Sequence, residues 1–253
     1  MKYSDYLQII KSIPKPTYIP TFNLNGKLII CLIEYRIMEE IEYVINAVLQ
    51  VYDSNEIGLA IVHGTNNSKY VEELFGHWKN ILFINTGHDN LNRGTYSALL
   101  KMPTFWENFM NWSHILIYQT DALIIRKIDE LYFQYDYIGA PWKNFNNWKK
   151  HNGGNGGFSL RNVNNMIKVC EKFRNINFEK LPKNNEDGYF CDQDLLKFIS
   201  ESDLELHKAF SMETSYHPRP VGIHQLYWYA NMIMNKSELE SMIIYIKDNL
   251  NIK

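Results

Sequence analysis

The chain has 253 residues, a length that suits one large domain with a full hydrophobic core. Its formal net charge of -2 at pH 7 argues against a nucleic-acid partner, because proteins that bind nucleic acids normally carry a basic face. Hydrophobic residues make up 45% of the sequence, yet no apolar stretch approaches the ~20 residues that span a bilayer, so we predict a soluble protein.

The cysteines and the N-terminus indicate the compartment. Cys31, Cys170 and Cys191 are odd in number and widely spaced, which predicts neither a disulfide framework nor a cysteine-based zinc site. The N-terminal sequence lacks the apolar core of a signal peptide. We therefore predict a protein of the cytoplasm, a reducing compartment.

The first half of the chain alternates between strand and helix patterns. Residues 1–26, with three prolines before residue 21, are expected to form an N-terminal arm, and residues 27–253 a single domain. Apolar runs predict strands and helical spacing predicts helices between them. The predicted strands cover residues 27–35, 57–62, 81–84 and 115–119, and the predicted helices cover residues 38–51, 69–78 and 96–109.

Beyond residue 121 the pattern becomes less regular. Segments rich in glycine and aromatic residues predict short strands, and helical spacing returns further on. The expected strands lie at residues 135–141, 156–161 and near Glu213, and the expected helices at residues 163–173, 186–200 and 237–250. The whole pattern predicts an α/β fold with a mostly parallel, doubly wound central sheet and a smaller mixed-strand region.

The predicted strand before residue 120 ends abruptly on the polar tripeptide Gln119-Thr120-Asp121. Ligands of open α/β sheets lie just beyond the carboxyl ends of the strands, so Asp121 is a candidate anchor for a metal or ligand. The alternative is a polar turn in which Asp121 caps the next segment.

A dense glycine segment, Asn-Gly-Gly-Asn-Gly-Gly, covers residues 152–157. Such glycines allow the backbone to approach a ligand closely. No Gly-Lys-Ser/Thr follows, and a strand rather than a helix follows, so the segment is neither a Walker loop nor a dinucleotide fingerprint. Because apolar Phe158 and Leu160 come next, we favour a close-packed site loop over a flexible turn.

Glu186 and Asp187 stand at the start of a predicted helix. Acidic residues in a first turn often act as caps and dipole partners. The alternative is that one of these carboxylates points into a cleft as a general base. Asp192 and Asp194 follow on the same predicted helix, and we expect them to be solvated.

His224 follows Gly222-Ile223, with Trp228 four residues further on. A lone histidine is more often structural, but Asp121 is a second candidate metal ligand. One aspartate and one histidine, with phosphate oxygens and water, form a suitable set for Mn²⁺ or Mg²⁺. Glu34 and Arg36 at the end of the first predicted strand could contact a nucleotide, and Arg36 could equally form a surface ion pair.

Five motifs occur in a fixed order along the chain. They are Ile-Tyr-Gln-Thr-Asp (117–121), Tyr-Asp-Tyr-Ile-Gly-Ala-Pro-Trp (135–142), Gly-Asn-Gly-Gly-Phe-Ser-Leu-Arg (154–161), Glu-Asp (186–187) and Gly-Ile-His (222–224). Together they resemble a family of domains of unknown function that is regarded as glycosyltransferase-like with the GT-A fold. That family is found in bacteria, fungi, protists and large DNA viruses, and the likeness runs from about Leu28 to Trp228.

The resemblance implies an inverting, metal-assisted glycosyltransferase. Such an enzyme moves a sugar from a nucleotide-diphosphate donor to a hydroxyl of a glycan or glycoconjugate acceptor. Asp121 would be a metal ligand at the place of the Asp-x-Asp motif, where Gln119 replaces the first acid, and His224 would be a second ligand. Asp187 would be the catalytic base, with Glu186 as the substitute candidate.

The remaining candidates are donor or substrate contacts. They are Glu34, Arg36, His63, Gln119, Thr120, Trp142, Asn155, Gly156, Gly157 and Trp228. Two other functions stay open at this point. The missing first acid favours a non-catalytic module that binds nucleotide sugars or glycans, whereas a metal-assisted hydrolase would need more acidic ligands than the chain offers.

Overall fold

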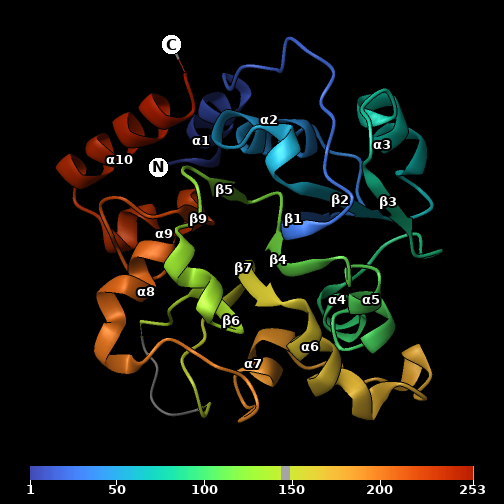
Figure 1. Cartoon of the computed structure of the whole chain (residues 1–253). Helices are drawn as coiled ribbons and strands as arrows, with labels where there is room; N and C mark the ends of the chain where they lie inside the picture. Colours follow the sequence, from blue (N-terminus) through green and yellow to red (C-terminus); the bar gives the residue numbers. More distant parts are fainter. Residues whose placement is uncertain (144–148, 253) are drawn as a thin grey trace.

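The computed structural model describes residues 1–143 and 149–252, and its centre is a six-stranded sheet in the order β3-β2-β1-β4-β7-β6 (Figure 1). The strands are β1 (Gly26–Ile33), β2 (Gly58–His63), β3 (Leu82–Asn85), β4 (Trp112–Tyr118), β6 (Tyr137–Ala140) and β7 (Asn155–Asn162). The first four run parallel, and β7 is antiparallel to both β4 and β6. The predicted α/β class with a mostly parallel central sheet is therefore confirmed.

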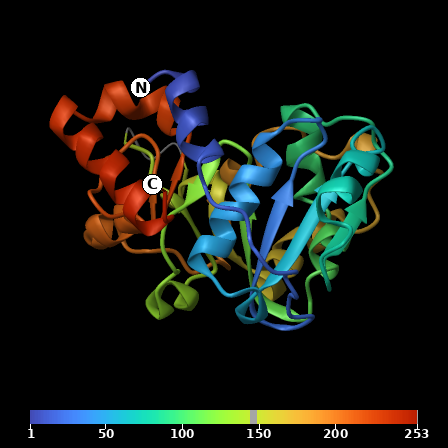
Figure 2. The ribbon, with the colours of Figure 1, turned by 90° about the horizontal axis from the view of Figure 1, so that it is seen from above.

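Helices lie on both sides of this sheet (Figure 2). The α-helices are α1 (Tyr3–Lys11), α2 (Glu40–Val51), α3 (Ser68–Phe75), α4 (Arg93–Leu99), α5 (Pro103–Glu107), α6 (Val163–Cys170), α7 (Glu186–Phe190), α8 (Leu204–Phe210), α9 (Leu226–Ile233) and α10 (Lys236–Asn249). Short 3-10 helices cover Ser54–Glu56, Glu130–Gln134, Glu171–Phe173, Phe178–Lys180 and Glu201–Asp203. Within the described residues, no helix is both long and apolar enough to cross a membrane.

Strand β1 shows why the apolar runs form a sheet that is covered on both faces. Alternate side chains of a strand point to opposite faces. Leu28, Ile30 and Leu32 pack into a core with α1, α2 and α3, whereas Ile29 and Cys31 belong to a second core with α4 to α7. A continuous apolar run is therefore what a strand between two helical layers requires.

A second, three-stranded sheet contains His224, the last of the five predicted motifs along the chain. It consists of β5 (Ala122–Ile124), β9 (Gly222–His224) and β8 (Ser211–Met212), in that order. Tyr118 at the end of β4 ties this sheet to α2, because its hydroxyl accepts from the Ile124 backbone N–H and donates to the Val44 carbonyl, each at 3.2 Å.

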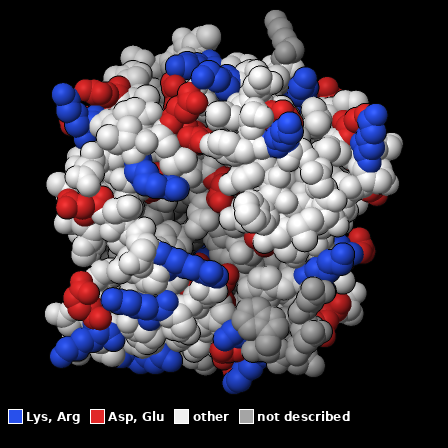
Figure 3. All heavy atoms as spheres, turned by 180° about the vertical axis from the view of Figure 1, so that it is seen from behind, with Lys and Arg blue, Asp and Glu red and all other residues white. Residues whose placement is uncertain are grey.

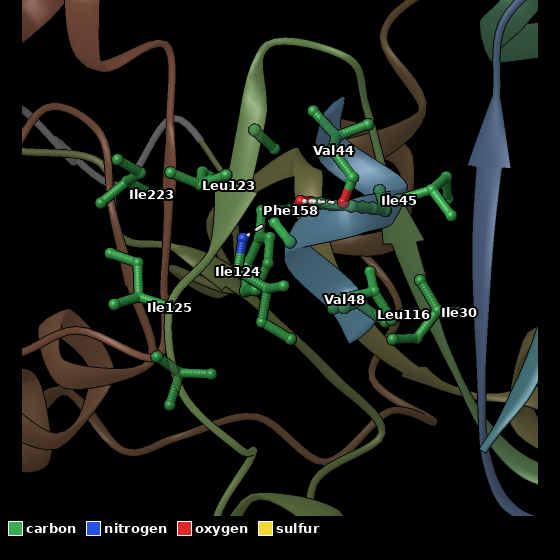
Figure 4. Close-up of a cluster of buried hydrophobic side chains, with 14 of the residues drawn as sticks. Ile30, Val44, Ile45, Val48, Leu116, Leu123, Ile124, Ile125, Phe158 and Ile223 are labelled. Atoms are coloured by element: carbon green, nitrogen blue, oxygen red, sulfur yellow. Dashed lines mark hydrogen bonds between the residues drawn. The ribbon is translucent and has the colours of Figure 1, made fainter. Parts of the chain in front are cut away.

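Figure 4 shows the packing that accompanies this link between the two sheets. Side chains from β1, α2, β4, β5, β7 and β9, together with the residue after β5, form one buried cluster, labelled there as Ile30, Val44, Ile45, Val48, Leu116, Leu123, Ile124, Ile125, Phe158 and Ile223. Burial of apolar side chains stabilises by roughly 1.5–3 kcal/mol each. The small sheet is thus held against the central one by a shared core.

The predicted helix over residues 96–109 is wrong, because the structure has two short helices there. Met102 is extended, with φ -80 and ψ 124, and Pro103 begins α5. Proline disfavours the helical conformation in the residue before it, which ends the first helix and starts the second.

The predicted helix over residues 186–200 is also too long, since α7 ends at Phe190. Backbone groups beyond it bond to distant partners instead of continuing the helix. The Cys191 carbonyl accepts from His151 N–H at 3.0 Å, and the Lys197 N–H donates to the Asp136 carboxylate at 2.8 Å. Asp194 forms an exposed ion pair with Lys150, in keeping with the expected solvation, whereas the pair of Asp192 with Lys149 is partly buried.

Both ends of the chain pack on the domain. The segment predicted as an arm contains helix α1, and its Tyr6 and Ile10 are buried in the core that includes α2. At the other end, α10 buries Met242 and Ile246, as its apolar face predicts. Leu250, just after α10, is buried in the same core.

Candidate functional site

A polar cavity of about 900 Å³ lies beyond the carboxyl ends of β1 and β4. This is the edge at which open α/β sheets bind ligands. Residues of β7, α7 and β9 also line it. Of the residues predicted from the sequence, it brings together Glu34, Arg36, Gln119, Thr120, Asp121, Asn155, Gly156, Gly157, Glu186, Asp187 and His224.

Asp121, His224 and Gln119 lie in contact with one another in the wall of the cavity, and we call this group the histidine corner. His224 Nε2 lies 3.3 Å from Asp121 Oδ1 and 3.3 Å from Gln119 Oε1. The pairing of Ala122 with His224 across β5 and β9 places these side chains next to each other. The turn also uses the Asp121 backbone, because Gln225, at a left-handed φ of 52, donates from its N–H to the Asp121 carbonyl and from its amide to the Asp121 carboxylate.

Glu213 stands behind the histidine corner and was not predicted as part of the site. Its Oε1 lies 3.1 Å from His224 Nδ1, and both side chains are buried. Burial opposes a charge on His224, but hydrogen bonds to Asp121 and Glu213 outweigh it and raise the pKa of His224 to about 9. The imidazole therefore bridges two carboxylates. The only sequence signal for Glu213 was its position beside a short predicted strand.

The histidine corner fits part of a divalent-metal site. Neighbouring ligands of an octahedral ion bound at ~2.1 Å lie about 3 Å apart, close to the 3.3 Å spacing of the corner atoms. A carboxylate on the other imidazole nitrogen, as with Glu213, is the usual orientation of a metal-binding histidine. Among the described residues, no three His, Cys, Asp or Glu side chains form a metal-binding cluster. Ligand oxygens and water would have to complete the shell.

Two glycines bring strand β7 directly against the polar side chains. A Cβ on Gly157 would lie 2.2 Å from His224 Nε2 and 2.7 Å from Gln119 Oε1. A Cβ on Gly156 would lie 2.2 Å from Glu186 Oε1. No side chain fits at either position, so these glycines are required for close approach rather than for flexibility.

Glu186 is the partner of a buried arginine. Its two carboxylate oxygens accept from the Arg161 guanidinium at 2.8 and 3.1 Å, and both side chains are buried. The guanidinium also lies over the rings of Tyr137 and Phe190, with centroids 4.7 and 5.2 Å away. This pair anchors the start of α7 to β7.

Asp187 is the other acid at the start of α7, and it is only partly buried. Its Oδ1 accepts from the Gly188 N–H at 2.6 Å. Burial, together with the negative charge of Glu186, raises the pKa of Asp187 to about 6. Carboxylates with raised pKa values in a cavity are typical of functional sites.

Glu34 forms a compact polar cluster at the end of β1. Its carboxylate is buried, accepts from the guanidinium of Arg36 at 2.7 and 2.8 Å, and accepts from the Thr120 hydroxyl at 3.1 Å. Burial opposes ionisation, but the hydrogen bonds and charge of Arg36 lower the pKa of Glu34. Arg36 therefore makes the predicted ion pair and lines the cavity as well.

Three predicted donor or substrate contacts lie outside this cavity. His63 is buried, with Nδ1 3.0 Å from the Gly64 carbonyl and its ring edge-on to Phe83. Trp142 lines a separate pocket of about 590 Å³. Trp228 is 67% exposed on α9. The rotation of α9 directs its two neighbours into the cavity, and the sequence could not reveal that rotation.

Sequence reasoning missed two groups of residues that line the cavity. Tyrosines from α1 and α9 line it, and so do Asn92 and Arg93 at the start of α4. The largely polar segment 85–93, which follows the predicted strand over residues 81–84, was a usable signal for Asn92 and Arg93. For the tyrosines, the only signal was their abundance, 17 in the chain.

Positive and negative side chains are interspersed over the face in Figure 3, whose surface is hollowed near its centre.

The chain belongs to the family described as "Protein of unknown function (DUF5672)", whose model matches residues 81–224, more than half of its length. No curated protein matches the chain in sequence.

Several solved structures of glycosyltransferases are similar in fold. Glycosyltransferase GlyE of Streptococcus pneumoniae TIGR4 is 11% identical, with a TM-score of 0.47, and the match covers 90% of this chain but 62% of that one. S. aureus TarS 1-349, in complex with UDP, is 11% identical, with a TM-score of 0.44 and coverage of 88% and 65%. Mannosyltransferase PcManGT from Pyrobaculum calidifontis, in complex with GDP-Man and Mn²⁺, is 10% identical, with a TM-score of 0.42 and coverage of 96% and 75%.

This chain therefore spans less than two thirds of the first two proteins. At identities of 10–11% and TM-scores below 0.5, none of these similarities assigns a role to a residue of this chain.

Proposed function

We propose that this protein is a glycosyltransferase that moves a sugar from a nucleotide-diphosphate donor to a hydroxyl of a glycan or glycoconjugate. The observation that carries the proposal is that one polar cavity holds both the histidine corner and Asp187, which come from distant parts of the sequence. The ordered motifs that resemble GT-A glycosyltransferases supply the reaction class.

The histidine corner is the proposed place for the diphosphate and its metal. Asp121 and His224 would hold Mn²⁺ or Mg²⁺, with Gln119 as a neutral oxygen neighbour. When bound, the ion would neutralise the charge that develops on the leaving diphosphate. Thr120 and Asn155 are proposed as polar contacts to the donor, and Gly156 and Gly157 let β7 lie against the polar side chains of the cavity.

Asp187 is the proposed catalytic base. The acceptor oxygen forms a bond to the anomeric carbon, its proton passes to the Asp187 carboxylate, and the sugar–phosphate bond breaks. A pKa of about 6 leaves this carboxylate ionised at neutral pH and still a useful base. Glu186 is not favoured for this role, because Arg161 already occupies both of its oxygens. A single displacement with one base would invert the anomeric configuration.

The sharpest test of the base is Asp187→Asn. We expect transfer to fall by roughly 10²–10⁴-fold, the usual contribution of a general base, while nucleotide-sugar binding persists. Asp194→Asn changes an exposed carboxylate after α7 and is the matched control, which should retain full transfer. A fully active Asp187→Asn protein would contradict the assignment.

A second candidate function is a non-catalytic module that binds nucleotide sugars. Gln119 at the place of an acid, and the lack of a third acidic or histidine ligand among the described residues, favour it. Thermal-shift titration against a panel of nucleotide sugars, with and without Mn²⁺, tests the binding that both functions require. Product formation with candidate acceptors then separates them, because the module would bind the donor and never turn it over.

A further inference from the structure

Three tyrosines form an aromatic surface at one end of the cavity, which we call the tyrosine wall. Tyr3 and Tyr6 come from α1, and Tyr227 comes from α9, so the wall exists only because these helices pack together (Figures 1 and 2). The Tyr227 ring lies 5.0 Å from that of Tyr3 and 5.5 Å from that of Tyr6, between centroids. All three line the same cavity as the histidine corner.

The tyrosine wall has polar groups that suit a ligand. Tyr3 donates its hydroxyl to the carboxylate of Glu40, which also lines the cavity. The Tyr6 hydroxyl is buried and has no hydrogen-bond partner among the residues that the structure describes. Because an unpaired buried hydroxyl is unfavourable, it indicates a partner that the chain itself does not supply.

The two ends of the cavity lie on either side of the histidine corner. Burial raises the pKa of Tyr227, and the charges that act on it come from Asp121, Arg36 and Glu40. The charges that act on Asp187 come instead from Glu186, Arg161 and Arg93. Figure 1 shows the same division, because α4 and α7 lie on one side of β9, which carries His224, and α1 and α9, which form the tyrosine wall, lie on the other.

A nucleotide sugar has a fixed linear order of nucleoside, diphosphate and sugar. If the diphosphate lies at the histidine corner and the sugar faces Asp187, the nucleoside must extend to the opposite end. Aromatic side chains stack on any nucleobase, because every base has a π face. We propose that the tyrosine wall, with Arg36 beside it, seats the nucleoside of the donor. This inference rests on the proposed function of the same cavity.

The test measures binding of nucleoside diphosphates, without a sugar, to the whole chain. UDP, GDP, ADP and CDP are titrated by calorimetry in the presence of Mn²⁺, and the tightest is carried into the variants. Tyr227→Leu removes an aromatic face and should weaken that nucleotide roughly ten- to hundredfold. Tyr227→Phe keeps the face and should stay within a few-fold of the parent.

The matched control is Trp228→Leu, which removes a larger aromatic side chain from the same helix. Trp228 is 67% exposed and lies outside the cavity, so nucleotide binding should be unchanged. If Tyr227→Leu does not fold, Tyr3→Leu replaces it, because Tyr3 is 44% exposed and its loss leaves the core intact.

Each possible result of these titrations either supports or overturns the proposed nucleoside seat. Weaker binding in Tyr227→Leu or Tyr3→Leu, but not in Trp228→Leu, supports the nucleoside seat. Unchanged nucleotide binding overturns it, and so does a loss confined to acceptor saccharides, which would make the wall an acceptor subsite. In both of those cases the Asp187→Asn result can still uphold glycosyl transfer. A parent protein that binds none of the four nucleotides overturns the seat and the proposed function together.

Discussion

The two ends of the cavity are built in different ways. The histidine corner is made by strand ends, where register places Asp121 beside His224 through the pairing of β5 with β9. The tyrosine wall is made by helices α1 and α9, which are distant in sequence and meet only by packing. The residues at a strand end can be recognised from the sequence of that segment, whereas the contact between two distant helices cannot. We therefore expect substitutions of the buried residues behind the histidine corner and α7 to have large effects on stability and function. Substitutions in the tyrosine wall should have smaller effects.

The largest expected effect is in the buried support of the strand-end region. Arg161→Met leaves the Glu186 carboxylate buried without its partner, and breaking a buried pair in this way costs about 3–5 kcal/mol. We expect urea unfolding to show this loss. Arg174→Met removes an arginine from the more exposed pairs with Glu107 and Glu171 and should cost no more than about 1 kcal/mol per pair. Equal losses in the two variants would contradict the anchoring role of Arg161.

The next effect is expected at Asp187, where removal of the carboxylate should raise stability while it abolishes the proposed base. Its folded pKa of about 6 lies above the ordinary value of 3.8, so the folded state binds the proton more tightly than the unfolded chain does. Protonated Asp187 therefore stabilises the folded state fully below about pH 4, and this stabilisation is lost as the pH rises through about 6. Asp187→Asn should be more stable than the parent at pH 7.5, by on the order of 2–3 kcal/mol. Transfer by the parent should rise with pH up to about 6 and then level off. The free energies of unfolding of the two proteins are measured at pH 4 and pH 7.5. The same difference between them at both pH values would contradict the raised pKa of Asp187.

A smaller effect is expected at Glu213, behind the histidine corner. Glu213→Gln removes the charge that orients His224 Nδ1, and loss of such a support typically weakens metal binding by 10–100-fold. Mn²⁺ affinity, followed by electron paramagnetic resonance in the presence of a nucleoside diphosphate, measures it independently of transfer. Glu205→Gln, on the exposed side of α8, is the control and should bind Mn²⁺ as the parent does. Equal Mn²⁺ affinity in both variants would rule out the orienting role.

The smallest effect is expected in the tyrosine wall. Tyr6→Phe removes a buried hydroxyl that has no partner among the described residues, so the free protein should be as stable as the parent or more stable by about 1 kcal/mol. Nucleotide binding should weaken slightly at the same time. Thermal unfolding with and without the nucleotide measures both. A destabilised free protein would indicate that the hydroxyl has a structural role.

The strand-end residues were accessible from the sequence because their geometry is local. An apolar run that stops at Gln119-Thr120-Asp121 predicts a polar group at a sheet edge, whatever the rest of the chain does. The same holds for Glu34, and for Gly156 and Gly157 at the start of β7. Strand ends of one sheet meet at one edge, so these residues converge without knowledge of the loops between them.

The failures come from helices, whose orientation depends on distant contacts. Trp228 was predicted as a contact, but its neighbours Tyr227 and Tyr229 line the cavity instead, and only the rotation of α9 decides this. The predicted helix at residues 186–200 stopped at Phe190 because Asp136 and His151 satisfy the backbone beyond it. Neither cause is visible within the segment itself.

By itself the sequence determined the alternation of strands and helices, the central sheet and the polar groups at its carboxyl edge. Apolar runs and helical spacing are properties of each segment and need no partner to be recognised. Only the tertiary structure decided that Glu186 is bound to Arg161, that Glu213 holds His224, and that α1 supplies part of the cavity wall. These are contacts between residues 11 to more than 200 positions apart, and they form where packing brings the side chains together.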